Sequence, residues 1–208
     1  MKKCLFVCLL YMISLAQGLL SDDTYSPCCS SFLQASPTLE IKGGVFFFSN
    51  SKMRKIYNNP GAEVQVVGTY PILDWVHAYG SVGYQRTNGR STGDHQRTFI
   101  SKIPVNLGFK AIYSICPITR CYIALGPRYF YLHQHNESRY VNRNICRNGL
   151  GGFVNTGISF FPKENLLLDL FLEYSYEKIR PHSSKTAVYR RNIQVGGITI
   201  GAGVGHVF

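Results

Sequence analysis

Two histidines spaced two residues apart are the first candidates for chemistry in this chain. His133 and His135 would point to the same side of an extended segment, where both imidazoles could reach one metal ion. Two histidines alone make a weak site, because a protein zinc site uses three or four protein ligands. The glycines near the C-terminus follow a strand-like alternation and form no phosphate-binding loop. We therefore expect no metal, no cofactor and no catalytic residue.

Cysteines offer a second kind of chemistry, and the sequence has seven of them. Cys116 and Cys121 flank a short turn between two segments that we expect to be adjacent antiparallel strands. Facing residues of such strands lie ~4.5–5.5 Å apart, which suits a disulfide. We expect a Cys116–Cys121 bond, with two unpaired thiols as the alternative. Cys146 falls in a long connector and is the best candidate for a bond between chains.

The first 18 residues have the pattern of a secretory signal peptide. A positive start precedes an apolar run over residues 4–15 and a cut site of small residues at 16–18. The apolar run is shorter than the ~20 residues that a spanning helix needs. The alternative is a buried N-terminal helix. We expect export to an oxidising compartment, followed by a polar leader over residues 19–37 and a barrel domain over residues 38–208.

From residue 38 onward, apolar residues recur with a period of two. Hydrophobic residues make up 45% of the chain and charged residues only 16%, below the ~25% of ordinary soluble domains. Apolar and polar residues alternate in eight segments of about ten residues, as in half-buried strands. The segments begin near Leu39, Ala62, Val76, Ile103, Ile123, Gly152, Leu166 and Ile198.

The connectors between these segments alternate in length. Short ones fall at 71–74, 115–120 and 162–165. Long ones fall at about 49–60, 86–97, 133–148 and 178–192. Strands of ~9–11 residues with short turns at one end and long loops at the other are typical of a transmembrane β-barrel. The fold class is therefore all-β, an eight-stranded antiparallel up-and-down transmembrane barrel, with a secreted β-sandwich as the alternative.

The chain resembles the small eight-stranded outer-membrane proteins, the group of the OmpA transmembrane domain, OmpX and OmpW. The resemblance covers about residues 38–208 and is carried by the segments 102–113 (KIPVNLGFKAIY), 124–131 (ALGPRYFY) and 201–208 (GAGVGHVF). It implies the outer membrane of a Gram-negative-type bacterium and a C-terminal Phe208 that the barrel-insertion machinery recognises. The cysteines also resemble those of disulfide-linked envelopes such as chlamydial ones, so other envelope proteins are candidate partners.

The long connectors carry most of the positive charge. They hold fourteen of the 22 basic residues and two acidic ones, and the resemblance places them outside the cell. Such a rim would contact lipid and lipopolysaccharide phosphates, or sulfated glycans on a host surface; nucleic acid is a poor candidate. We expect polyanion binding by Lys52, Arg54, Lys55, Arg86, Arg90, Arg139, Arg143, Arg147, Arg180, Lys185, Arg190 and Arg191.

Charged residues also occur on the polar face of the strands. Eight strands leave an interior only wide enough for side chains, and buried charges must pair. We expect a plugged, ion-paired lumen that also contains His77; a narrow gated channel is the alternative. The lumen ion pairs are predicted from Glu40, Lys42, Glu63, Lys102, Lys110, Arg128, Asp169 and Glu173.

An enzymatic role is a second alternative that the resemblance raises. Two proteins of this group modify lipid A, and the deacylase among them uses a His-x-Ser pair near the outer end of a late strand. His182 and Ser184 match that spacing, but Pro181 precedes them and the flanking strand pattern departs from the deacylase. The expected role is therefore envelope integrity and surface contact, as an adhesin or a structural barrel, and not catalysis.

Overall fold

Strands make up most of the computed structural model, which describes residues 36–57, 60–90, 97–116, 118–136, 144–179 and 193–208. All of these residues belong to one compact unit, Gln34–Phe208. The elements are β1 (Thr38–Phe48), α2 (Ser51–Ile56), β2 (Gly61–Leu73), β3 (Val76–Arg90), β4 (Arg97–Cys116), β5 (Thr119–Asn136), β6 (Asn144–Lys163), β7 (Leu166–Ile179), β8 (Ile193–Gln194) and β9 (Gly197–Val207).

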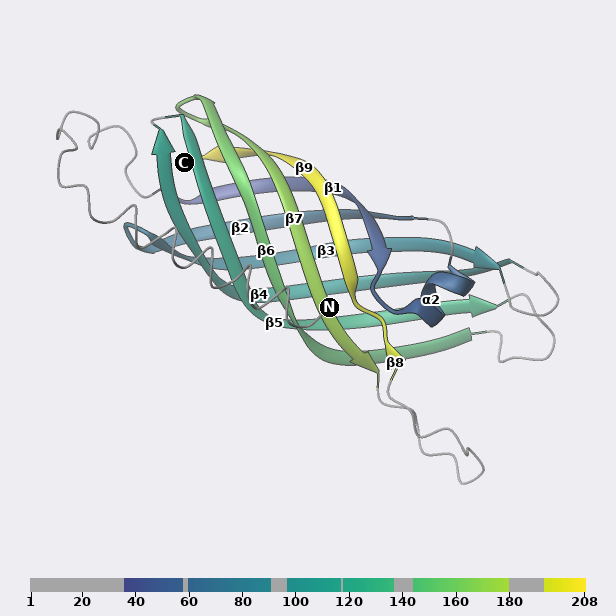
Figure 1. Ribbon diagram of the computed structural model, residues 1–208. Coiled ribbons are helices and arrows are strands. Elements are labelled where there is room, and N and C mark those ends of the chain that lie inside the picture. The colour runs from purple at the N-terminus through teal and green to yellow at the C-terminus, as the bar shows by residue number, and fades with distance from the viewer. Residues whose placement is uncertain (1–35, 58–59, 91–96, 117, 137–143, 180–192) are drawn as a thin grey trace, which may run out of the picture. The chain divides into compact units, whose positions relative to one another are not determined.

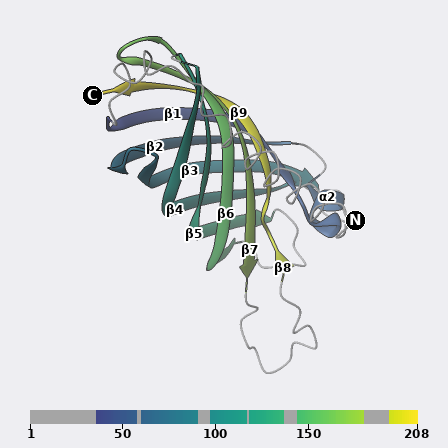
Figure 2. The same ribbon diagram turned by 60° about the vertical axis from the view of Figure 1, so that its left-hand side comes forward.

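The eight long strands close into a ring in which each strand pairs antiparallel with its neighbours (Figures 1 and 2). Consecutive strands pair from β1 to β7, and β9 closes the ring by pairing with both β7 and β1. The two-residue β8 extends the pairing of β7. Closure leaves no unpaired edge, the condition for a sheet that sits in lipid. The predicted eight-stranded barrel is confirmed.

The two ends of the barrel differ. At the turn end, tight turns join β2 to β3, β4 to β5 and β6 to β7. At the opposite, loop end, longer connectors follow β1, β3, β5 and β7. The short helix α2 lies in the first of these connectors, where no helix was predicted.

Side chains alternate between an apolar outer face and a polar inner face. In β7, Leu168, Leu170 and Leu172 are exposed on the outside, whereas Asp169 and Glu173 are buried inside. The same inversion of the usual globular pattern holds around the ring, where apolar side chains from Leu39 in β1 to Val204 in β9 face outward. An exterior of this kind avoids water only in lipid, so the sheet is a membrane-facing surface.

The strands are longer than the ten or so residues expected from alternation. β4 and β6 each have 20 residues, because pairing continues into segments that were predicted as loops. Arg90 pairs with Arg97, and His135 pairs with Asn144, near the loop end. Backbone pairing does not require an apolar outer face, so these extensions lack the pattern by which strands were recognised.

No helix within the described ranges is long and apolar enough to cross a membrane. The predicted signal peptide (1–18) and nearly all of the leader (19–37) lie outside the described residues.

A charge on the outer face should weaken the barrel according to its depth. Leu107, in the middle of β4, is 64% exposed on this face. Leu107→Arg should cost about 2–4 kcal/mol of folding free energy in phospholipid vesicles, because arginine is then held in hydrocarbon. Asn88→Arg, on an exposed residue near the loop end of β3, is the matched control and should cost at most about 1 kcal/mol. Urea titration followed by gel mobility measures both, and equal losses would contradict a lipid-facing β4.

Candidate functional site

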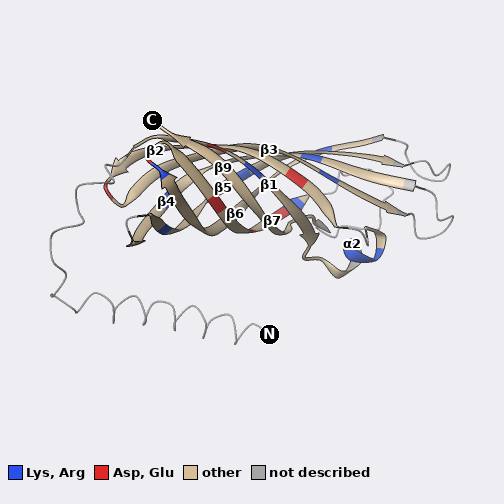
Figure 3. Ribbon diagram, turned by 90° about the horizontal axis from the view of Figure 1, so that it is seen from above, with Lys and Arg blue, Asp and Glu red and all other residues tan. Residues whose placement is uncertain are grey.

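The interior of the barrel holds all eight residues that were predicted to form lumen ion pairs. They project from β1, β2, β4, β5 and β7, and each is at most 3% exposed. They fall into two groups, one toward the turn end and one toward the loop end. Figure 3 shows the charged residues of the strands in relation to the two ends of the barrel.

The turn-side network comprises Glu40, Lys42, Lys110, Tyr122 and Asp169. Lys42 Nζ lies 2.6 Å from Asp169 Oδ2 and 3.1 Å from Glu40 Oε2. Lys110 Nζ lies 3.2 Å from the other oxygen of Glu40. The Tyr122 hydroxyl donates to Asp169 Oδ2 over 2.7 Å and accepts from Lys42 Nζ over 3.0 Å. Two cations balance two carboxylates here.

Glycines of β9 leave room for this network. A Cβ atom at Gly203 would lie 2.9 Å from Cγ of Lys42, and one at Gly205 would lie 2.8 Å from Cγ of Glu40. Both separations are shorter than carbon atoms tolerate without a shift. The alternating glycines near the C-terminus thus serve packing inside the barrel.

The loop-side network comprises Glu63, Lys102, Arg128, Glu173 and Glu177. The Arg128 guanidinium pairs with Glu173 through one terminal nitrogen and with Glu177 through the other, at 3.2 Å. Lys102 Nζ lies 2.9 Å from Glu177. Glu177 was left out of the predicted lumen set, although its alternation with Asp169 and Glu173 along β7 placed it on the same face.

Glu63 has neutral partners, unlike the other carboxylates of the loop-side network. It accepts hydrogen bonds from Gln65 Nε2 at 2.9 Å and from Thr199 Oγ1 at 2.6 Å. No ion pair joins it to a cation among the described residues. The predicted pairing of Glu63 is therefore corrected to a hydrogen-bonded carboxylate, which leaves this network with three acids and two bases.

Apolar side chains close the loop end of the interior. The largest cluster packs α2 and Tyr57, the residue that follows it, against the loop ends of the strands. The rings of Phe48 and Tyr57 lie 5.6 Å apart. Burial raises the pKa of the Tyr57 hydroxyl above its usual value, so this phenol stays neutral. The cluster consists of Phe46, Phe48, Met53, Tyr57, Ile100, Phe130, Leu132 and Val195. It was not predicted, since α2 was not.

The predicted polyanion-binding residues are only partly described. Arg54 and Lys55 are exposed on α2 at the loop end, and Arg86 is exposed near the loop end of β3. Arg147, on β6, is half-buried. Only the backbone is described for Lys52 and Arg90. The other six lie outside the described residues: Arg139, Arg143, Arg180, Lys185, Arg190 and Arg191.

Acidic residues show the opposite distribution. Within the described ranges, the side-chain carboxylates outside the lumen are those of Asp74 and Glu164, and both lie at the tight turns. The described part of the loop end therefore carries exposed basic side chains and no exposed acidic one.

Comparison with solved structures identifies the architecture. The structure matches Ail, the attachment invasion locus protein of Yersinia pestis, with 14% identity, a TM-score of 0.53, and coverage of 85% of this chain and 100% of Ail. It matches OprG of Pseudomonas aeruginosa with 14% identity, a TM-score of 0.54, and coverage of 84% and 97%. It matches Neisserial surface protein A with 16% identity, a TM-score of 0.53, and coverage of 84% of this chain and 98% of that protein. The fold is that of a small outer-membrane β-barrel.

These identities establish the fold alone. No family model matches the chain, and a search of curated proteins finds no relative. The resemblance inferred from residues 38–208 is thus confirmed at the level of architecture. None of the three proteins named above is chlamydial.

The predicted Cys116–Cys121 disulfide does not form in the structure. Both thiols are free, and so is that of Cys146, which is exposed on β6. The expectation assumed that Cys116 and Cys121 face each other across the turn. The register instead pairs Cys121 with Tyr113, and a shift near the turn pairs Cys116 with Thr119. The prediction was wrong because the turn is tighter than the sequence indicated.

Three further predictions concern His77, the C-terminal residue and the His182–Ser184 pair. His77 lies in the lumen as expected, 2% exposed, but it makes no ion pair within the described residues. Phe208, the expected insertion signal, is 70% exposed at the turn end, and its amide donates to the Pro37 carbonyl. His182 and Ser184, the pair weighed for catalysis, lie outside the described residues.

Proposed function

We propose that this chain is an integral outer-membrane barrel whose lumen is closed by paired charges and whose basic loop end binds polyanions. The polyanions are lipopolysaccharide phosphates or sulfated glycans on a host surface. The observation that carries the proposal is the separation of charge, with buried, paired charges inside the barrel and exposed basic residues at the loop end.

The closed lumen is supported by how completely side chains occupy it. Arg128, the largest of the fully buried side chains, extends past β6 to β7, and Lys42 extends past β9 to β7 from the other side. A barrel of eight strands has an interior just wide enough for such side chains. The apolar cluster beneath α2 adds a second barrier at the loop end. Such an interior blocks the free diffusion of solutes.

The polyanion contact is supported by the chemistry of the exposed residues. Arg54, Lys55 and Arg86 meet no exposed acid in the described part of the loop end. Like charges gathered on one rim attract a multivalent anion more strongly than scattered charges do. Arginine also pairs with phosphate and sulfate through two parallel hydrogen bonds.

A structural neighbour with the same architecture has been solved with a polyanion analogue. A crystal structure of Ail holds the heparin analogue sucrose octasulfate, and that structure covers 83% of this chain at 16% identity with a TM-score of 0.51. This complex makes sucrose octasulfate the natural first probe for the present chain.

The remaining parts of the proposal concern assembly. Phe208 serves as the signal for the barrel-insertion machinery, and the exposed Cys146 is the position for a disulfide to another envelope protein. The barrel contributes to envelope integrity and performs no catalysis.

Removing the loop-end charges should weaken polyanion binding. A variant with Arg54, Lys55, Arg86 and Arg147 replaced by Gln should bind sucrose octasulfate at least about tenfold more weakly at low salt, since each exposed pair contributes up to ~1 kcal/mol. Calorimetric titration of the refolded full chain measures the affinity.

Two further variants complete this test. Lys163→Gln removes an exposed charge at the turn end and should leave the affinity unchanged. Replacing Arg180, Lys185, Arg190 and Arg191 together tests the fourth connector. Salt should weaken wild-type binding by screening. Unchanged affinity in both multiple variants would contradict a loop-end site.

A further inference from the structure

The outer wall of the barrel carries a cluster of basic, polar and aromatic side chains next to its apolar band. β3, β4 and β5 lie side by side toward the loop end (Figure 1). Five side chains on these strands point outward there. They form what we call the lateral cluster, which comprises Arg86 of β3, Phe99 and Ser101 of β4, and His133 and His135 of β5.

Alternation assigns the lateral cluster to the outer face. Arg86 lies between Gln85 and Thr87, which are both buried inside the barrel. Phe99 precedes the buried Ile100 of β4 in the same way. Successive side chains of a strand point to opposite faces, so Arg86 and Phe99 face away from the lumen. The register places the other three members opposite one another or opposite Phe99, on that same face.

Stacking positions the cation of the lateral cluster. The Arg86 guanidinium lies over the Phe99 ring, 4.9 Å from its centroid, and the Phe99 ring stacks on the His135 imidazole with centroids 5.1 Å apart. A guanidinium that stacks through its flat face keeps its N–H donors free in the plane of the group. Arg86 is exposed, and no carboxylate pairs with it in the part of the chain that the structure describes. Its fork of donors can therefore bind an anion from outside.

An apolar wall continues from the lateral cluster toward the turn end. On β3 the outward side chains run from Val82 to Tyr84 to Arg86, and on β4 Ile103 comes next to Ser101 on this face. The Tyr84 hydroxyl and Ser101 Oγ lie 3.1 Å apart, which joins the two strands at this level. Aliphatic, then tyrosine, then cation is the order of side chains across a membrane–water boundary. Arg86 thus lies at the level of the lipid headgroups.

Other basic residues at the loop end occupy a different place. Arg54 and Lys55 are exposed on α2, which packs over the apolar cluster that closes the lumen. Arg147 faces the buried Leu132 in register and so lies on the inner face of β6. An anion bound by these residues approaches along the barrel axis. An anion bound by Arg86 lies beside the wall.

We propose that the lateral cluster binds the phosphate of a membrane lipid whose acyl chains lie along the apolar wall. Arg86 supplies the forked donor that matches two phosphate oxygens, and His133 supplies an imidazole donor on the far side of Ser101. A soluble sulfated glycan would have to displace lipid to reach an arginine that faces sideways. The inference rests on the proposed polyanion binding at the loop end, and it assigns the lipid phosphate to one set of residues within that end.

Titration with lipid A that carries two phosphates tests the site. Native mass spectrometry of the refolded full chain in a maltoside detergent measures the affinity, and a neutral glycolipid of the same acyl-chain length serves as the reference lipid. Wild-type protein should bind lipid A more tightly than the neutral lipid. Arg86→Gln should weaken lipid A binding by about three- to fivefold, as expected for the loss of one exposed charge pair. Arg86→Lys should have an intermediate affinity, because it keeps the charge without the fork.

Phe99→Leu removes the ring that positions Arg86 and should weaken lipid A binding by about twofold. This variant and Arg86→Lys carry the test if Arg86→Gln fails to fold, and gel mobility before and after boiling establishes folding for each protein. Lys55→Gln is the matched control at the same end of the barrel, because Lys55 is exposed on α2 and lies outside the lateral cluster. Its affinity for lipid A should equal that of the wild type.

A second titration, with sucrose octasulfate, separates this inference from the proposed function. Arg86→Gln alone should change the affinity for this soluble polyanion by less than about twofold. Undiminished lipid A binding by folded Arg86 and Phe99 variants would overturn the lateral site, whereas sucrose octasulfate binding that depends on the other loop-end residues would leave the proposed function standing. A loss of sucrose octasulfate binding in Arg86→Gln equal to or larger than the loss of lipid A binding would also overturn it. Absence of binding of either probe to the wild type would contradict both.

Discussion

Replacing Arg128 with Met should lower the free energy of unfolding of the barrel by about 3–5 kcal/mol, the range found when one partner of a buried ion pair is removed. Arg128, on β5, is 1% exposed and joins Glu173 and Glu177 of β7 inside the lumen. Without it, Glu177 keeps Lys102 at 2.9 Å. Among the described residues, Glu173 keeps only the neutral donors Gln65 and Asn155, at 3.5 and 3.3 Å. The loss of stability therefore comes mainly from the Glu173 carboxylate, which is left buried without a cation.

That cause can be separated from a loss of packing. Adding Glu173→Gln to Arg128→Met removes the unpaired buried charge and should restore at least about half of the lost stability. Glu63→Gln is the matched control, because it neutralises a carboxylate whose partners are already neutral, and it should be neutral or slightly stabilising. Urea unfolding in phospholipid vesicles measures all four proteins. A double variant no more stable than Arg128→Met would show that packing dominates.

Replacing Lys42 with Met should have a second large effect, also of about 3–5 kcal/mol. Lys42 lies between Asp169 and Glu40 and is fully buried. Glu40 retains Lys110, but Asp169 is left with the hydroxyls of Tyr122 and Ser159, at 2.7 and 2.9 Å. Those two hydroxyl donors partly stabilise the Asp169 charge, so the loss of unfolding free energy should fall in the lower half of that range.

The rescue variant for this network is Lys42→Met combined with Asp169→Asn. Asparagine still accepts from one hydroxyl and carries no charge, so most of the stability should return. Lys163→Met, at an exposed position near the turn end, is the control and should change the unfolding free energy by less than about 0.5 kcal/mol. If Lys42→Met proves as harmless as the control, the turn-side network contributes nothing to stability.

Alternation along single strands was enough to predict the barrel and its two faces. The leucines of β7 and the acids between them show this directly, since a period of two assigns each side chain to one face. The eight lumen positions follow from the same rule. The rule gives a face but not a partner, so it did not show that Glu63 bonds to Thr199 from β9 while Arg128 takes Glu173 and Glu177.

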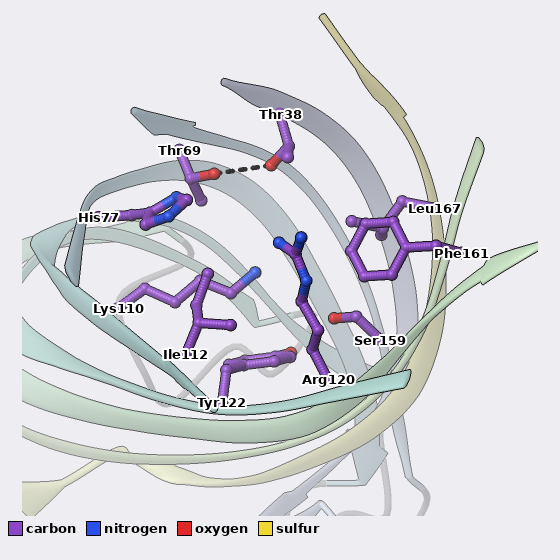
Figure 4. Close-up of a pocket in the computed structure, with 10 residues that line it drawn as sticks. All are labelled: Thr38, Thr69, His77, Lys110, Ile112, Arg120, Tyr122, Ser159, Phe161 and Leu167. Carbon is purple, nitrogen blue, oxygen red and sulfur yellow. Dashed lines mark hydrogen bonds between the residues drawn. The ribbon is translucent and has the colours of Figure 1, made fainter. Parts of the chain in front are cut away.

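Features that depend on register or on turns were not predicted. The Cys116–Cys121 bond required two residues to face each other, and a shift near Cys116 removes that relation. Arg120 was assigned to a turn, yet it is the second residue of β5, and its guanidinium lies over the Phe161 ring at the turn end (Figure 4). His77 was expected in the ion-paired lumen and lies there, but it makes no ion pair within the described residues. Each of these depends on contacts between strands, which a single sequence does not specify.

The closed lumen is the central claim, and solute flux through reconstituted protein tests it most directly. Osmotic swelling of liposomes that contain the refolded full chain is compared with liposomes that contain an equal amount of a sixteen-stranded porin. Gel mobility before and after boiling verifies that the chain is folded in those same liposomes. The paired charges and the apolar cluster at the loop end predict no sugar flux above that of empty liposomes. Flux approaching that of the porin would contradict the closed lumen.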